Sequence, residues 1–66
     1  MKRVKLKEKG YKYIYVFDIY PTGMEKIPIE IYAKEKMTDE EIIQQKESFK
    51  LTFPNPRIDE PRVIVI

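Results

Sequence analysis

A chain of 66 residues buries only about 60% of the surface that its unfolded form exposes, so we expect one marginally stable domain spanning residues 1–66. It contains no cysteine and no histidine, which excludes disulfides, thiolate metal sites and the commonest nucleophiles and proton shuttles of enzymes. The net charge of +2 hides an asymmetry, because residues 1–12 carry six basic side chains against one acidic one and the remainder is net negative.

The first half of the chain predicts three antiparallel strands. Val4 and Leu6 alternate with basic residues, which indicates a half-buried strand that ends in a turn at Gly10. Residues 11–20 form a long second strand rich in aromatic and β-branched side chains. A turn at Pro21-Thr22-Gly23 leads into a third strand through residues 27–31.

The segment "MTDEEII" predicts the start of a helix. Thr38 and Glu41 have the spacing of a capping box, and Met37 is placed to pack on Ile42 as a hydrophobic staple. The helix is expected to run from about Asp39 to Ser48 or Phe49, with Ile42, Ile43 and Phe49 as its apolar stripe.

The segments after the helix are expected to be extended. "FKLTF" is compatible with a short strand, "PNPRIDEP" is rich in turns, and the apolar "RVIVI" is predicted to lie inside the sheet because its exposure would promote aggregation. Pro28 argues that the third strand lies at an edge or a bulge. The fold class is therefore α+β: a small antiparallel sheet in the order β-β-β-α-β, with an optional short strand after the helix, and one helix on one face.

Either face of the second strand is apolar enough to be the core. We favour a register with a three-residue loop at residues 8–10 and a four-residue loop at residues 21–24. In this register Val16 lies opposite Ile29, and the buried face of the sheet carries Val4, Leu6, Ile14 and Val16. The opposite parity would pair Phe17 with Ile27 and Tyr15 with Ile29. One helix cannot cover both faces, so the second must meet something else, which is a curled-over sheet, a partner or a ligand.

The aromatic face of this strand is the predicted interaction surface. Tyrosine suits interfaces because it buries a large apolar area and keeps a polar tip. We therefore expect a non-enzymatic module that binds another protein, as a homodimer or as an inhibitor or accessory protein, through Tyr11, Tyr13, Tyr15, Phe17 and Tyr32.

A single-stranded nucleic acid is the alternative partner. The stretch "KGYKYI" resembles the first ribonucleoprotein motif of RNA-recognition and cold-shock domains, in which a basic residue and glycine precede alternating aromatics. The resemblance covers about the first fifteen residues, and a capped helix follows where a five-stranded barrel would have a strand. It implies bases stacked on the tyrosines and phosphates near basic side chains, for which the candidates are Arg3, Lys5, Lys7 and Lys12.

No residue pattern predicts catalysis, a metal or a cofactor. The only carboxylate cluster, Asp39 to Glu41, is explained by helix capping, and both glycines are explained by turns. The apolar runs are too short to span a bilayer, and the N-terminal residues lack a signal-like apolar core, so we expect a cytoplasmic protein.

Overall fold

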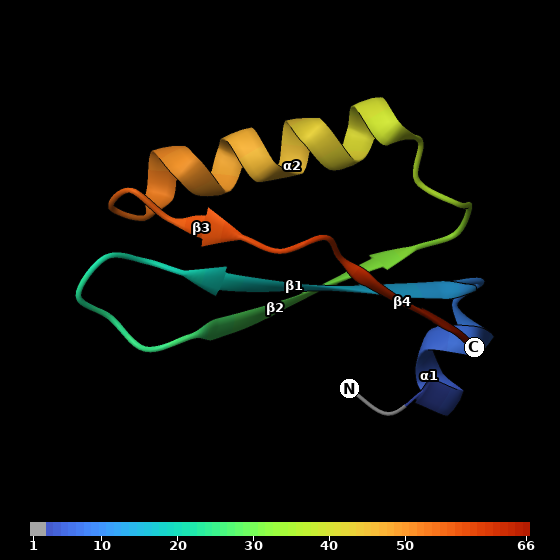
Figure 1. Ribbon diagram of the computed structural model, residues 1–66. Coiled ribbons are helices and arrows are strands. Elements are labelled where there is room, and N and C mark those ends of the chain that lie inside the picture. Colours follow the sequence, from blue (N-terminus) through green and yellow to red (C-terminus); the bar gives the residue numbers. More distant parts are fainter. Residues whose placement is uncertain (1–2) are drawn as a thin grey trace.

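The computed structural model describes residues 3–66. Its elements, in chain order, are α1 (Arg3–Glu8), β1 (Tyr13–Tyr20), β2 (Ile27–Ala33), α2 (Asp39–Thr52), β3 (Arg57–Ile58) and β4 (Arg62–Val65). The predicted α+β class is confirmed: α2 lies along one face of a small antiparallel sheet, and the short α1 lies at one end of the other face (Figure 1). Neither helix in residues 3–66 has the length and apolar character needed to cross a membrane.

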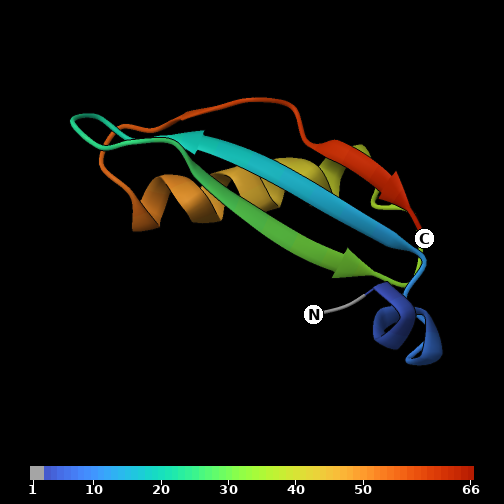
Figure 2. The ribbon, with the colours of Figure 1, turned by 90° about the horizontal axis from the view of Figure 1, so that it is seen from below.

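The central strand of the sheet is β1, which pairs with all the others. β2 lies along one side of it, and β3 and β4 share the other side (Figure 2). Among the described strands β2 pairs only with β1, so β2 is an edge strand. This agrees with the prediction made from Pro28, since proline is tolerated in edge strands. Every strand therefore depends on β1 for its backbone hydrogen bonds.

The main core lies between β1 and α2. Tyr15, Phe17 and Ile19 are buried there with Phe49 of α2, and the rings of Phe17 and Phe49 meet edge to face with centroids 5.3 Å apart. The predicted capping box at Thr38 is confirmed. The helix extends beyond its expected end to Thr52, so the short strand expected at 49–53 is wrong. In the same helix Ile43, expected in the apolar stripe, is 54% exposed.

The register between β1 and β2 places the aromatic residues of β1 in this core. Phe17 pairs with Ile29 and Tyr15 with Ile31. The favoured register, with Val16 opposite Ile29, is wrong. The alternative register is right about which face of β1 is buried. Its pairing is displaced by two residues, because Phe17 lies opposite Ile29 and not Ile27. The cause is the connection over residues 21–26, which is longer than a tight turn.

The first predicted strand is instead the helix α1. Its end is a Schellman motif, in which the Tyr11 N–H donates to the Leu6 carbonyl and the Gly10 N–H donates to the Lys7 carbonyl, at 3.0 Å each. Gly10 has a φ of 91°, which suits the left-handed position of this motif. Gly10 thus ends a helix and does not form a hairpin turn.

The second face of the sheet is covered by α1. Leu6 is 1% exposed and packs with Ile14 and Val16, and four partly buried residues surround them: Tyr11, Tyr32, Ile64 and Ile66. Beyond this cluster the same face is polar, and an ion pair joins Asp18 to Arg62 at 3.3 Å. The apolar half of the second face is therefore covered within one chain.

A bulge separates β3 from β4. Ile58 pairs with Ile19 and Arg62 pairs with Val16, so the outer chain has one more residue than β1 between these two pairs. The extra residue reverses the alternation of side chains: Ile58 packs toward α2, whereas Ile64 packs toward α1. β4 pairs only with β1 among the described strands, so the expectation that the last strand lies inside the sheet is wrong.

Candidate functional site

The sheet face predicted to bind a partner is largely enclosed. Tyr15 is 1% exposed and Phe17 is fully buried, both beneath α2. The Tyr15 hydroxyl accepts a hydrogen bond of 2.8 Å from the Met37 N–H, just before the helix. In this conformation Tyr15 and Phe17 are core residues and offer no surface to a partner.

Replacing Tyr15 with phenylalanine is expected to destabilise the domain by about 1–3 kcal/mol, because the partly buried Met37 N–H loses its acceptor while the ring still fills the core. Urea unfolding followed by circular dichroism measures this loss. Tyr20→Phe is the matched control, because the Tyr20 hydroxyl has no hydrogen bond to the described residues, and it should change stability by less than about 0.5 kcal/mol. Equal stability of the two variants would contradict a structural role for the Tyr15 hydroxyl.

The remaining predicted tyrosines are half-buried at the margins of the sheet. Tyr11 and Tyr32 lie on the α1 side with ring centroids 6.1 Å apart, and the Lys34 ammonium is 5.5 Å from the centre of the Tyr11 ring. The Tyr32 hydroxyl donates to Glu30 at 3.0 Å, and this hydrogen bond raises the pKa of Tyr32. Tyr13 packs at the edge of the α2-side core.

The predicted basic residues gather at the same end of the molecule. Arg3, Lys5 and Lys7 are exposed on α1, and Lys12 is exposed just before β1. Because Arg3, Lys5 and Lys7 lie on a helix, they do not alternate along a strand as the sequence predicted. The helix α1, which carries three of the predicted basic residues, lies at the end of the sheet where β4 finishes and α1 leads into β1 (Figure 1).

Within residues 3–66 no strand pairs with the outer side of β4, which is therefore an open strand edge. The Ile66 N–H donates to the Lys12 carbonyl at 2.9 Å, so by the alternation of a strand Ile64 also faces β1, while the N–H and C=O groups of Val63 and Val65 point outward. Val63 is 46% and Val65 is 73% exposed. An apolar edge with free backbone groups is a template for another strand.

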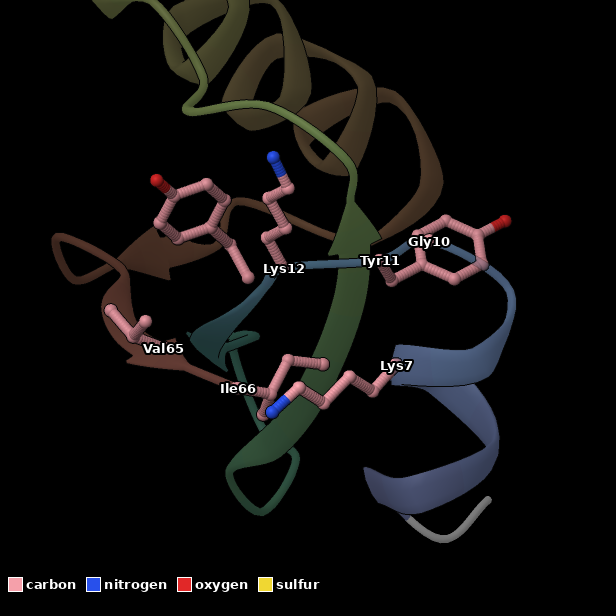
Figure 3. A pocket seen from close by; sticks show the side chains of 7 residues that line it. Lys7, Gly10, Tyr11, Lys12, Val65 and Ile66 are labelled. Carbon is pink, nitrogen blue, oxygen red and sulfur yellow. The ribbon is translucent and has the colours of Figure 1, made fainter.

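A hollow of about 310 Å³ lies beside this edge (Figure 3). Its walls combine two lysines, two tyrosines and the end of the last strand, namely Lys7, Lys12, Tyr11, Tyr13, Val65 and Ile66. The Lys7 side chain extends toward Ile66 (Figure 3). A second hollow of about 210 Å³ shares Lys7, Val65 and Ile66 and adds Arg3 and Val4, and no carboxylate side chain lines either one.

Val63 and Val65 are the site residues that the sequence prediction missed. The signal was present in Pro61, which interrupts strand pairing and accompanies the bulge that moves the last strand to an edge. Comparison of the chain with family models, curated proteins and solved structures found no match.

Proposed function

We propose that this chain is a non-enzymatic protein-interaction module that forms a homodimer by pairing β4 with β4 of a second copy. The observation that carries the proposal is the open apolar edge of β4, where Val63 and Val65 expose both their side chains and their backbone hydrogen-bonding groups. Native sheets usually protect such an edge, and strand addition satisfies it.

The backbone selects an antiparallel register centred on Ile64. In that register Val63 of one copy lies opposite Val65 of the other, and each such pair exchanges both of its outward hydrogen bonds. A shift by two residues would bring Pro61 opposite Val65, and proline has no N–H to donate. The centred register is therefore the one in which every outward pair makes both of its hydrogen bonds, whereas the shifted register leaves a proline in two of its pairs.

The side chains favour the same arrangement. Val63 and Val65 of the two copies would form one apolar cluster on the α2 side, and β-branched cross-strand pairs stabilise antiparallel sheets. The exposed Ile43 of α2 flanks this side, where it lines a shallow hollow with Glu60. Dimer formation would thus remove a cluster of exposed apolar groups from water.

Charge supports a second copy as the occupant. The basic residues of α1 lie at one end of β4, and Asp59 and Glu60, which pair with Arg57 and Lys46 of the same chain, precede its other end. Antiparallel pairing brings the acidic end of each copy toward the basic end of the other, whereas parallel pairing would bring like charges together. The charge distribution therefore favours antiparallel over parallel pairing of two copies.

The test is sedimentation equilibrium over micromolar to millimolar concentrations. Wild-type chain is expected to form a reversible dimer of twice the 8.0 kDa chain mass. The affinity should be weak, in the micromolar range or above, because a four-residue edge covers less than the standard interface of about 1,600 Å².

Two variants should abolish the dimer without unfolding the chain. Val65→Pro removes an outward N–H and no bond to β1, and Val63→Lys places a charge in the valine cluster. Leu51→Lys is the matched control, because Leu51 is 91% exposed on α2, away from the edge, and should leave the dimer intact. A wild-type monomer throughout the concentration range, or a dimer that survives both edge variants, would overturn the proposal.

A further inference from the structure

Two lysines and two tyrosines, and no carboxylate side chain of residues 3–66, line the hollow at the end of the sheet. The Tyr11 ring packs on the α1 side of the sheet and Tyr13 packs on the α2 side, so the hollow lies where the two faces meet. Lys7 comes from α1, Lys12 and Tyr13 from the start of β1, and Tyr11 from the segment that joins them. Its volume of about 310 Å³ is at the lower end of the range for small-ligand sites. The Schellman motif at Gly10 fixes the position of α1 relative to β1 and so holds Lys7 at the edge of the hollow, where its side chain extends toward Ile66 (Figure 3).

The charge around the hollow selects an anionic occupant. The second hollow, which adds Arg3, continues the basic lining along α1. The Lys34 ammonium over the Tyr11 ring adds a cation from the segment that follows β2. A ligand that satisfies this lining needs negative charge spaced along its length and flat apolar groups between the charges.

We propose that this hollow binds single-stranded nucleic acid. The strand passes around the end of the sheet, so that one unpaired base contacts Tyr11 on the α1 side and another contacts Tyr13 on the α2 side, while the phosphates lie near Lys7 and Lys12 and Arg3 extends the path along α1. A duplex is excluded because its bases are already stacked and paired. An acidic peptide would satisfy the lysines but would leave the tyrosine rings without flat partners. This inference is independent of the dimer.

Fluorescence anisotropy with a labelled oligothymidylate of about 12 nucleotides tests the proposal, since that length lies within the site sizes of single-strand-binding proteins. Binding is expected at low salt and should weaken as salt rises, because binding displaces counterions from the phosphates. Labelled duplex of the same length and a polyglutamate peptide serve as competitors, and both should compete at least about tenfold less well than unlabelled oligothymidylate.

The variant Lys7→Gln with Lys12→Gln should lower the affinity at least about tenfold and reduce the salt slope by about 1.4, the value for two lost phosphate contacts on a single strand. The matched control is Lys26→Gln with Lys50→Gln, which removes the same charge far from the hollow and should bind like wild type. Tyr13→Leu should weaken binding while leaving the salt slope unchanged.

Three results would overturn the proposal: no binding at low salt, equal competition by polyglutamate, or equal loss in the two lysine-pair variants. The outcome is distinguishable from that of the dimer. Val63→Lys, which lies outside the lining of the hollow, should abolish the dimer and still bind oligothymidylate, whereas the Lys7 and Lys12 variant should bind poorly and still form the dimer.

Discussion

Phe17→Ala is expected to abolish cooperative folding. Phe17 is fully buried at the centre of the main core and meets Phe49 edge to face. Truncating a core phenylalanine costs about 3–5 kcal/mol, and a chain of this length has a total stability of only about 3–10 kcal/mol. One side chain therefore accounts for between about a third and all of the stability.

Thermal unfolding followed by circular dichroism measures this effect. Phe17→Ala should show no folded baseline at room temperature, or a melting temperature far below that of wild type. Leu51→Ala removes a similar apolar side chain from a position that is 91% exposed, and should change stability by no more than about 0.5 kcal/mol. Similar melting curves for Phe17→Ala and wild type would show that β1 does not present its aromatic face to α2.

Leu6→Ala is expected to release α1 from the sheet and to cost about 2–5 kcal/mol. Leu6 is the only buried residue of α1, and it covers Ile14 and Val16. A helix of six residues has no stability of its own in water, so it should lose its structure once this contact is lost.

Urea unfolding gives the energy of this change, and NMR chemical shifts of residues 3–8 report whether α1 persists. Val4→Ala is the matched control, because Val4 lies in the same helix but is 67% exposed. It should retain both the helix and nearly all of the stability. Equal losses in the two variants would mean that α1 does not cover the second face.

The elements with strong local signals were predictable from the sequence. The capping box at Thr38 satisfies backbone donors within one turn, so its residues determine the helix start without help from the rest of the fold. The aromatic and β-branched run of β1 likewise predicted a strand, and residues 13–20 form it.

The first helix and the positions of the strands in the sheet depend on distant contacts, and these were not predictable. Val4 and Leu6 alternate with charges as in a strand, and a six-residue helix with one buried side chain shows no helical period that would compete with that pattern. The usable signal was the spacing of Leu6, Gly10 and Tyr11, which fits the Schellman motif and its apolar contact.

The candidate site was predicted only in part, for the same reason. One hollow at the end of the sheet is lined by Lys7, Tyr11, Lys12 and Tyr13, but these residues do not form the continuous sheet face that was predicted. A bulge between β3 and β4 reverses the faces to which their alternating side chains point. The position of this bulge depends on pairing with β1. The sequence of the last strand therefore did not reveal that its edge is open.

Amide hydrogen exchange at Val63 and Val65 is the most direct measurement of whether a second copy is seated on β4. These two N–H groups point away from β1, so they should exchange rapidly in dilute solution and become protected as the concentration rises, while the Ile64 N–H, which points to β1, stays protected throughout. Rapid exchange at Val63 and Val65 at every concentration would contradict pairing through this edge.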